Sequence, residues 1–404
     1  MRDMPQRDLV YLAWGNWGPY HYARLDAFAE LAATRGFRVV GLELYRGSGL
    51  YNWQYQQPKA PMVRLNFPPP EDRVRPFRMI FNAAPLIFRS RPAVIFATSY
   101  RPSSLMLNVF GRLCGARIVM MNDTHQHTTR DGAVRGLFKR LIVRRFHAAL
   151  VGGSKHKQFA VSLGLSPDRV FLGYDAVDNS FYSEESDLAR ERGDSTRAEH
   201  ILPPRYVLSL GRLLAKKNVE TLVAAFAVAR KSPSCADLSL VIVGDGPERE
   251  HLIQVSQSHG LTVTQSPGQT GPEAEADVHL LPSVGPRAVA AILGLAEVFV
   301  LASTTEEWGL VVNEAAACGL PLLVSSAAGC ADELCKDGVN GYQFDPTDIA
   351  VLAARIVELA SLPHIRERYG IASRQIVSEW GLERFASGAL AATMKSIAPR
   401  SAPL

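Results

Sequence analysis

The 404-residue chain is poor in cysteine and has no long apolar segment. Its five cysteines, an odd number, lie far apart and include no C-x-x-C pair. This pattern disfavours a disulfide scaffold or a zinc ribbon and favours a reducing compartment such as the cytoplasm. No window approaches the roughly 18 apolar residues of a membrane span, and no repeat of 20–50 residues recurs. The first apolar run, Leu9 to Trp14, is too short for an export signal, so we expect neither a spanning nor a secreted protein.

A strong excess of one charge is also lacking. Lys and Arg number 44 against 39 Asp and Glu, which gives a formal net charge of +5. Spread over the whole chain, this excess does not predict a surface that wraps nucleic acid. The composition, 47% hydrophobic and 21% charged, is typical of a globular protein with two domains of about 100–200 residues each.

What the chain does have is a regular alternation of short apolar runs with amphipathic segments of helical length. LVYLAW, AVIFATS and RIVMMN are each followed by such a segment, and the alternation restarts at RYVLSLG near residue 205. Continuous apolar strands between helices predict parallel sheets covered on both faces. We therefore predict an α/β protein with two Rossmann-like doubly wound domains that face a central cleft, where ligands bind at the carboxyl ends of the strands.

Composition also places the domain boundaries. Residues 181–204 are charged, lack a period and end in two prolines, which favours a linker. The predicted parts are an N-terminal domain (1–180), this linker, a C-terminal domain (205–378) and a C-terminal helix (379–404) that docks toward the N-terminal domain. Residues 262–277, rich in Gly, Pro and acid, predict a surface loop.

The most informative motif is STTEEWGLVVNEAAACGLPLLVS, in which seven residues separate Glu306 from Glu314. Gly309 lets a ligand approach the backbone, and the amides of Leu310 and Val311 lie at the start of a predicted helix, where an anion is favoured. Glu314 is placed to accept hydrogen bonds from hydroxyl groups. The motif suits a ligand with a central diphosphate and hydroxylated rings at both ends. The alternative is a pair of solvated glutamates near a helix start.

A pair of cations follows the first strand of the C-terminal half. Arg212 comes directly after YVLSLG, and Lys217 opens the next helix. Both are expected at the carboxyl edge of the sheet, where together they would neutralise a leaving diphosphate. The alternative is ordinary surface charge, and the neighbouring Lys216 is left outside the site.

Four motifs in this order resemble a known family. GRLLAKKN, VIVGDGPERE, TTEEWGLVVNEAAACGLPLLVS and DGVNGYQFDP are similar to the C-terminal domain of family 4 retaining glycosyltransferases of GT-B fold (glycosyl transferases group 1). The resemblance covers roughly residues 205–360 and is looser in the N-terminal half. The chain departs from the family in the length of the 262–277 loop and in Trp308, where the family often has Phe.

The resemblance implies a nucleoside-diphosphate sugar as donor substrate, with no cofactor and no metal, and the chain has no D-x-D motif. It places Arg212 and Lys217 on the diphosphate. It further places Glu314 on the ribose, Glu306 on the sugar hydroxyls and the backbone near Val284 on the base.

Two polar loops are candidates in the N-terminal half. WGNWGPYHYARL puts Gly15 and Gly18 before a helix without forming G-x-G-x-x-G, so a dinucleotide fold fits poorly. The resemblance suggests a loop that closes over the phosphates or the acceptor; the alternative is a plain turn. His21 is left to face either the cleft or solvent.

The second loop, MMNDTHQHTTR, places Asp123, His125 and His127 after a strand. Polar contacts to sugar hydroxyls are favoured there. A metal site is the alternative, disfavoured because no later ligand cluster follows.

Residues 132–158 hold seven Lys or Arg and no acid, together with an apolar stripe. Two interpretations stay open: a helix lying on an anionic membrane, or a core-packed helix with a solvated basic face. The bases are Arg135, Lys139, Arg140, Arg144, Arg145, Lys155 and Lys157, and the stripe is Leu137, Phe138, Leu141, Ile142 and Phe146.

Together these features predict a cytoplasmic, metal-independent retaining glycosyltransferase, peripheral at the inner membrane surface if 132–158 binds lipid. It would transfer a sugar to a hydroxyl of a glycan, a lipid-linked sugar or a small molecule, in glycan, glycolipid or glycoconjugate biosynthesis. The alternatives are a GT-B phosphorylase, in which Glu314 would have no ribose to bind, and a catalytically silent nucleotide-sugar-binding subunit, against which the intact Arg212, Lys217, Glu306 and Glu314 argue.

Overall fold

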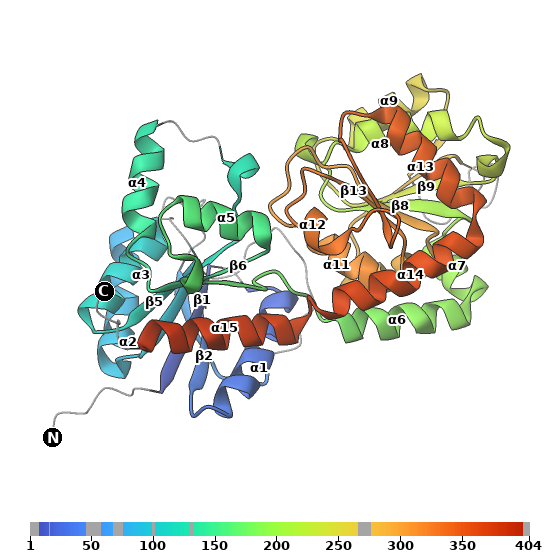
Figure 1. The fold of residues 1–404 in the computed structure, drawn as a ribbon. Coiled ribbons are helices and arrows are strands. Elements are labelled where there is room, and N and C mark those ends of the chain that lie inside the picture. Colours follow the sequence, from blue (N-terminus) through green and yellow to red (C-terminus); the bar gives the residue numbers. More distant parts are fainter. Residues whose placement is uncertain are drawn as a thin grey trace. The chain divides into compact units, whose positions relative to one another are not determined.

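The computed structural model describes residues 8–15, 17–45, 58–67, 76–98, 102–129, 133–265 and 276–398. The chain forms two compact units (Figure 1). The first unit comprises Met1–Val177 together with Trp380–Leu404, and the second comprises Asp178–Glu379.

The first unit is built on a seven-stranded parallel sheet of order β3-β2-β1-β4-β5-β6-β7. Its central strands β1, β4, β5 and β6 are almost completely buried, as the continuous apolar runs predict for strands covered on both faces. The strands are β1 Leu9–Trp14, β2 Arg38–Tyr45, β3 Met62–Phe67, β4 Val94–Thr98, β5 Arg117–Asn122, β6 Ala148–Val151 and β7 Val170–Leu172.

Helices cover both faces of this sheet. On one face, α1 (Pro19–Ala33) and α15 (Leu382–Ile397) share a core with the side chains of Val10, Leu12 and Phe96. The other face carries a separate core built from four helices, and it includes Tyr11 and Ile95 of the same strands. These helices are α2 Pro76–Ser90, α3 Pro102–Leu113, α4 Ala133–Val143 and α5 Ser154–Ser162; the 3-10 turns are η2 Gln126–Thr128 and η3 Pro167–Arg169.

The second unit repeats this architecture with a seven-stranded parallel sheet of order β10-β11-β9-β8-β12-β13-β14. The predicted α/β class with two doubly wound sheets is therefore confirmed. The strands are β8 Tyr206–Leu210, β9 Ser239–Val243, β10 Val263–Thr264, β11 Val278–Leu281, β12 Val298–Leu301, β13 Leu322–Ser325 and β14 Gly341–Phe344.

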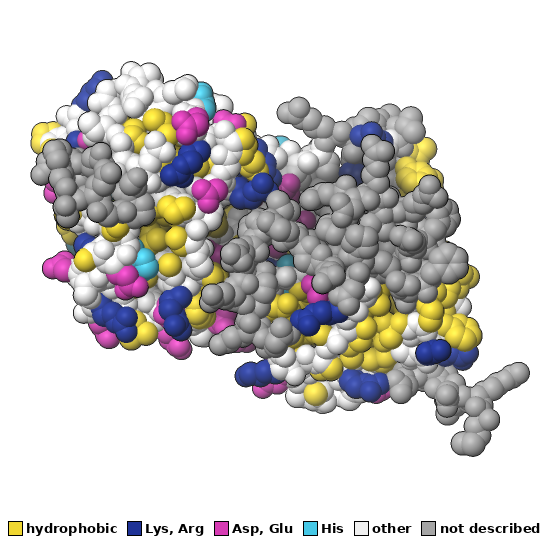
Figure 2. All heavy atoms as spheres, turned by 180° about the vertical axis from the view of Figure 1, so that it is seen from behind, with side chains coloured by type: hydrophobic (Ala, Val, Ile, Leu, Met, Phe, Trp, Pro, Cys, Tyr) yellow, Lys and Arg dark blue, Asp and Glu magenta, His cyan; other side chains and the backbone are white. Residues whose placement is uncertain are grey.

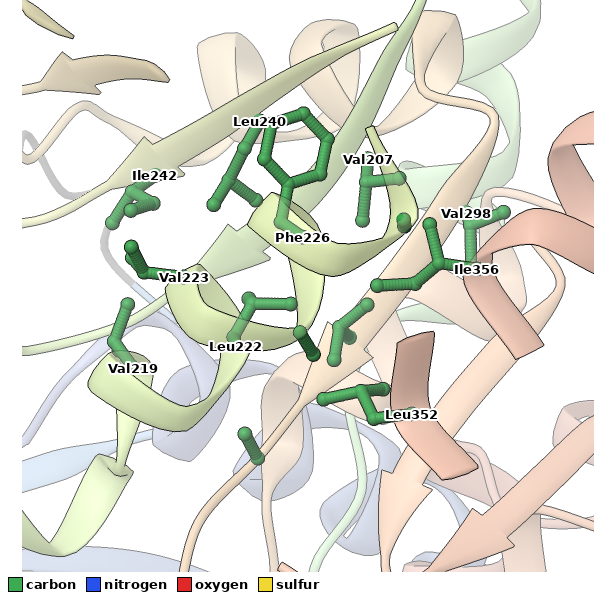
Figure 3. Close-up of a cluster of buried hydrophobic side chains, with 14 of the residues drawn as sticks. Val207, Val219, Leu222, Val223, Phe226, Leu240, Ile242, Val298, Leu352 and Ile356 are labelled. Carbon is green, nitrogen blue, oxygen red and sulfur yellow. The ribbon is translucent and has the colours of Figure 1, made fainter. Parts of the chain in front are cut away.

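One core of the second unit lies between the sheet and a group of helices that includes α8 and α13 (Figure 3). Leu222 and Phe226 of α8 are fully buried and pack with Val207 and Leu240 of the strands and with Ile356 of α13. The helices are α6 Asn179–Arg192, α7 Asp194–His200, α8 Val219–Ala229, α9 Arg249–Ser258, α10 Pro286–Leu295, α11 Leu310–Ala317, α12 Ala331–Leu334, α13 Ile349–Ser361 and α14 Pro363–Ser378; the 3-10 turns are η4 Ala215–Lys217 and η5 Pro233–Cys235.

The predicted linker, residues 181–204, is instead mostly helical and belongs to the second unit as α6 and α7. The Asp178 carboxylate caps α6 by accepting the Phe181 amide at 3.1 Å. The buried face of α6 consists of Tyr182, Ser186 and Ala189 rather than large aliphatic residues, which hides its period in the sequence. α6 packs closely on α10 because Gly294 has no side chain; a Cβ there would lie 2.7 Å from the Ser186 carbonyl oxygen.

The C-terminal helix α15 belongs to the first unit, where Phe385 and Ala389 are fully buried and contact the core shared with α1. Of the predicted 262–277 loop, residues 266–275 lie outside the described residues, and Val263–Thr264 forms the edge strand β10. In the described part of the chain, no helix combines the length and apolar character needed to cross a bilayer.

Candidate functional site

The site predicted from the C-terminal motifs lies at the switch point of the second sheet. β8 pairs with β9 on one side and with β12 on the other, so the connections leaving β8 and β12 at their carboxyl ends diverge. Ligands of doubly wound sheets bind at such a point. The loops that follow these two strands carry Arg212 and Lys217 on one side and Glu306 and Gly309 on the other.

The loop after β8 is held by glycines. Gly244 has φ 151°, and a Cβ at this position would lie 1.9 Å from the Gly211 carbonyl oxygen, so only glycine allows this approach. The amide of Leu213 donates to the Asp245 carbonyl at 2.9 Å. Between these contacts Arg212 is exposed, and it forms no ion pair within the described residues. Its guanidinium is therefore available to an anion.

The two loops are tied together by the backbone around Lys217. Asn218 adopts a left-handed conformation (φ 53°), and its side-chain amide donates to the Ala302 carbonyl at 3.1 Å and the Pro346 carbonyl at 2.8 Å. The Thr304 amide donates to the Lys216 carbonyl at 2.9 Å. Lys217 and Glu306 are thus brought together although 89 positions separate them.

Lys217 and Glu306 form a largely buried ion pair, with side chains 17% and 10% exposed. The Ser303 hydroxyl donates to the same Glu306 oxygen at 3.1 Å. A diphosphate arriving at Lys217 would compete with Glu306 for the ammonium group and would free the carboxylate for hydroxyl groups. The sequence assigned the two residues to different parts of a ligand, whereas the structure makes them partners.

Lys216, which the sequence analysis left outside the site, pairs with Glu307 at 2.8 Å in a more exposed position. Burial alone would raise the pKa of Glu307, but the hydrogen bond from Lys216 and the charges of Lys216 and Lys217 outweigh this, and the pKa lies below its usual value. Lys216–Glu307 and Lys217–Glu306 thus form two adjacent ion pairs between the same two loops.

α11 begins where the motif predicted a helix N-terminus. Gly309 caps the helix with φ 105°, and a Cβ would lie 3.0 Å from a Leu301 methyl group. The amides of Leu310 and Val311 then open the helix, where first-turn N–H groups have no partner within the helix. Trp308 is buried and fixes this turn, because its indole N–H donates to Asn313 Oδ1 at 2.8 Å. Glu314 lies in the second turn and is almost fully buried.

A small pocket opens at the carboxyl end of β8 and is lined by Gly211, Arg212, Lys217 and Leu301, among others. Val284, predicted to lie near the base, follows β11 and is 36% exposed. The preceding amide, that of Ser283, donates to Asp245 Oδ2 at 2.9 Å, which connects this segment to the loop after β9.

The predicted residues of the first unit lie at the carboxyl end of β5. Asp123 follows the strand and is half-buried, whereas His125 is buried and His127 is exposed. The segment is a 3-10 turn rather than extended, closed by the hydrogen bond that Thr128 Oγ1 donates to the His125 carbonyl at 2.9 Å. His127 therefore does not share the environment of His125.

His156 is a neighbour that the sequence analysis missed. It follows β6, the strand beside β5, is 1% exposed, and its ring lies 5.2 Å from the His125 ring in an edge-on arrangement. Its Nδ1 accepts the Gly153 amide at 3.0 Å. The same Gly-x-x-His pattern occurs at Gly18 and His21, and this repetition is the signal that would have found it.

The predicted Gly15 and Gly18 loop follows β1. Gly18 caps α1, and its amide donates to His21 Nδ1 at 2.9 Å, so a phosphate contact from this amide would require His21 to be displaced. Gly15 follows the strand directly. The His21 ring packs against Trp14, with 4.6 Å between ring centroids, and thus lies against the first unit's own core.

We expect His21 to lower the acid stability of the protein. Burial, then the charge of Arg24, lowers the pKa of His21 from 6.5 to about 3, although the Gly18 hydrogen bond opposes this. Between these two values the unfolded chain binds a proton that the folded chain does not, so the free energy of unfolding should fall as pH falls from 6.5 toward 3. In urea titrations, H21Q should flatten this dependence. H259Q, which changes another exposed histidine, should not; an equal effect of both variants would contradict the assignment.

Among the described residues, no group of three or more His, Cys, Asp and Glu side chains is arranged to hold a metal ion. The Asp123, His125 and His127 loop therefore does not assemble such a group within the part of the chain that the structure covers.

Comparison with known families and proteins bears on this site. Residues 194–376 match the family described as glycosyl transferases group 1. The second unit contains a group 1 glycosyltransferase domain. The resemblance to glycosyl transferases group 1 that the motifs predicted is thereby confirmed. The group 1 domain includes all of the candidate residues from Arg212 to Glu314.

Relatives and solved structures agree with this assignment. D-inositol 3-phosphate glycosyltransferase of Salinispora arenicola is 30% identical over 241 residues, 54% of this chain and 50% of that protein. Glycogen synthase of Mycobacterium tuberculosis is 31% identical over 173 residues, 43% of this chain and 38% of that protein. The chain thus spans about half the length or less of these curated relatives.

Over nearly the whole chain the fold is that of GT-B proteins. A glycosyltransferase from Rickettsia africae superposes with a TM-score of 0.73 at 13% identity, covering 97% of this chain and 99% of that one. HepE from Anabaena, in complex with UDP-glucose, superposes with a TM-score of 0.70 at 16% identity, covering 96% and 100%. At these identities the likeness establishes the fold alone.

Proposed function

We propose that this protein is a retaining glycosyltransferase of family 4 that moves a sugar from a nucleoside diphosphate to an acceptor hydroxyl. The observation that carries the proposal is the cationic pair at the switch point of a group 1 domain: Arg212 exposed, and Lys217 held by Glu306. Two cations beside the start of α11 suit a diphosphate leaving group.

Each residue then has one task. Arg212 and Lys217 neutralise the charge that grows on the diphosphate as the sugar leaves, with the amides of Leu310 and Val311 beside them. Glu314 binds the ribose, Glu306 binds sugar hydroxyls once Lys217 engages the phosphate, and the backbone at Val284 faces the base.

In the proposed mechanism the acceptor attacks the face from which the leaving group departs, and a diphosphate oxygen takes the acceptor proton. The Glu306 carboxylate is bound by Lys217 and Ser303, which favours a binding role over that of a covalent nucleophile. This arrangement retains the configuration of the sugar without an enzyme-bound intermediate.

The donor is proposed from the site and from similar proteins. HepE has been solved with UDP-glucose and with UDP, and it shares the fold of this chain. The acceptor is a hydroxyl of a glycan, a lipid-linked sugar or a small molecule, in a biosynthetic pathway for glycans, glycolipids or glycoconjugates. The proposed location is cytoplasmic, since all five cysteines are free thiols.

The test is a screen of nucleotide sugars by thermal unfolding, followed by hydrolysis assays without acceptor. A donor present at 100 times its Kd should add about 2.7 kcal/mol of apparent stability. Turnover of a nucleotide sugar supports the transferase. Phosphate-dependent cleavage of a glycan would instead identify a phosphorylase, and donor binding without any turnover would identify a silent subunit.

Turnover should survive a metal chelator. The cations Arg212 and Lys217 take the place that a divalent ion would have beside the diphosphate, and no D-x-D motif accompanies them. Activity measured after incubation with EDTA should equal that of the untreated enzyme. Loss of activity with EDTA, restored by Mn²⁺ or Mg²⁺, would contradict metal independence.

A further inference from the structure

The positive charge of the chain is concentrated in one stretch. The 95 residues from Arg73 to Pro167 contain sixteen Lys or Arg and only two acids, Asp123 and Asp131. The small net charge of the whole chain hides this excess, because the rest of the sequence is acidic. Such a charge asymmetry indicates a surface for an anionic partner.

This stretch includes α2, α3 and α4, which cover the same face of the first sheet. Residues from all three helices, or directly after them, contribute to one core: Ile87 of α2, Leu107 of α3, and Val143 and Phe146 at the end of α4. α2 and α3 also pack against each other. α4 joins this core through its C-terminal end, and the three helices lie on the side of the sheet opposite to α1 and α15.

Large apolar side chains are exposed on these helices. Each of the three helices contributes to them, and their exposed fractions run from 47% to 78%. Viewed from behind, the first unit shows hydrophobic side chains gathered over a broad area with Lys and Arg among them (Figure 2). The exposed apolar residues of these helices are Phe88, Val109, Leu113, Leu137, Phe138 and Leu141.

The apolar side chains of α4 and the residues after it are only partly used by the core. The predicted apolar stripe is divided: Phe146 is buried in the core and Ile142 is partly buried, whereas Leu137, Phe138 and Leu141 project into solvent. The core therefore does not need these three side chains. They lie on the same helix as the exposed Arg135 and Arg140. The solvent-facing side of α4 therefore carries both large apolar side chains and basic ones.

Exposed bases accompany the exposed apolar side chains. The Arg91 guanidinium lies over the Phe88 ring, 5.6 Å from its centroid. At the end of α4, Arg145 donates to the backbone carbonyl of Leu141 at 3.0 Å. Long basic side chains around apolar ones are typical of helices that insert shallowly into lipid while their charges bind headgroups. The exposed bases on or directly after α2 and α4 are Arg89, Arg91, Arg135, Arg140, Arg144 and Arg145.

We propose that the outer surface of α2, α3 and α4 binds an anionic lipid bilayer. Apolar side chains enter the headgroup region, and the surrounding bases bind lipid phosphates; both contributions are needed for firm attachment of a peripheral protein. Nucleic acid fits less well, because four of the six exposed apolar side chains, Val109, Leu113, Leu137 and Leu141, are aliphatic and offer no stacking for bases. The inference goes beyond the proposed transfer reaction and does not depend on it.

Sedimentation with phosphatidylglycerol-containing vesicles tests the proposal. The wild-type protein should sediment with these vesicles at low salt, should be released as salt rises, since the Debye length is about 10 Å at 0.1 M, and should not sediment with neutral phosphatidylcholine vesicles. R135E/R140E should weaken binding at least about tenfold. The matched control R192E/K231E reverses two exposed bases of the second unit and should bind as wild type.

A second pair of variants tests insertion. L137S/F138S should also weaken binding about tenfold, whereas L188S/I371S, which changes two exposed apolar residues of the second unit, should not. Circular dichroism and donor binding would verify that each variant is folded. Loss of binding in R135E/R140E but not in L137S/F138S would overturn insertion. The proposal would be overturned if the protein bound single-stranded nucleic acid but not anionic vesicles, or if it bound neither. Donor hydrolysis is measured separately, so a failure of the proposed transferase function would not be mistaken for a failure of membrane binding.

Discussion

Lys217→Ala and Arg212→Ala should each reduce turnover by on the order of 10²–10³-fold, because each removes a cation aimed at charge that develops on the leaving diphosphate. Lys217→Ala also deprives the buried Glu306 of its ammonium partner. The measurement is kcat for donor hydrolysis and for transfer, with thermal unfolding as a check on folding.

Lys216→Ala is the matched control, since Lys216 is adjacent in sequence but pairs with the more exposed Glu307. Its turnover should stay within about threefold of wild type. Glu314→Ala should chiefly weaken binding of the free nucleotide. If Lys216→Ala were as inactive as Lys217→Ala, or if Arg212, Lys217 and Glu314 variants lost nucleotide affinity equally, the assigned roles would be wrong.

Asp123→Ala and His125→Ala should each lower turnover by on the order of 10²-fold while the free nucleotide still binds normally. Both lie at the carboxyl end of β5 in the first unit, whereas the residues proposed to bind the nucleotide lie in the second. Retaining transfer passes through a sugar with positive charge at its reacting carbon, so groups that grip the sugar contribute mainly in the transition state.

His127→Ala is the matched control for this loop. Because the His127 side chain is exposed, this substitution should reduce turnover only mildly. Calorimetric nucleotide affinity separates a transition-state role from general damage. His125→Ala also removes the ring that packs on His156, so circular dichroism and unfolding should accompany it. If the wild-type protein contained stoichiometric zinc and either variant lost it, the loop would be a metal site. If both variants kept wild-type turnover, the loop would have no catalytic role.

The sequence predicted the parallel sheets well because buried parallel strands are continuous apolar runs, as in Leu9–Trp14 and Val298–Leu301. It failed for α6, whose buried face is made of Tyr182, Ser186 and Ala189 and depends on the close approach of Gly294. A helix that packs through small and polar residues has no apolar period to detect.

For the site, local motifs predicted the residues that follow a strand, such as Arg212 and Gly309. They did not predict contacts that depend on which strands are neighbours. Ser303 binding Glu306, and His156 beside His125, arise from strand order and loop conformation rather than from spacing. The hydrogen bond from the Gly18 amide to His21 likewise could not be predicted, because it depends on where α1 begins.

The division of the first unit between the two ends of the chain has a consequence for biosynthesis. The second unit is one continuous segment, Asp178–Glu379, and all of it is synthesised before Trp380 is added. The first unit, whose strands are synthesised first, lacks α15 until the second unit has been made, and Phe385 and Ala389 of that helix are fully buried in its core. During translation the first unit is therefore completed after the second. Until α15 is synthesised, the face of the first sheet that α15 shares with α1 stays partly uncovered.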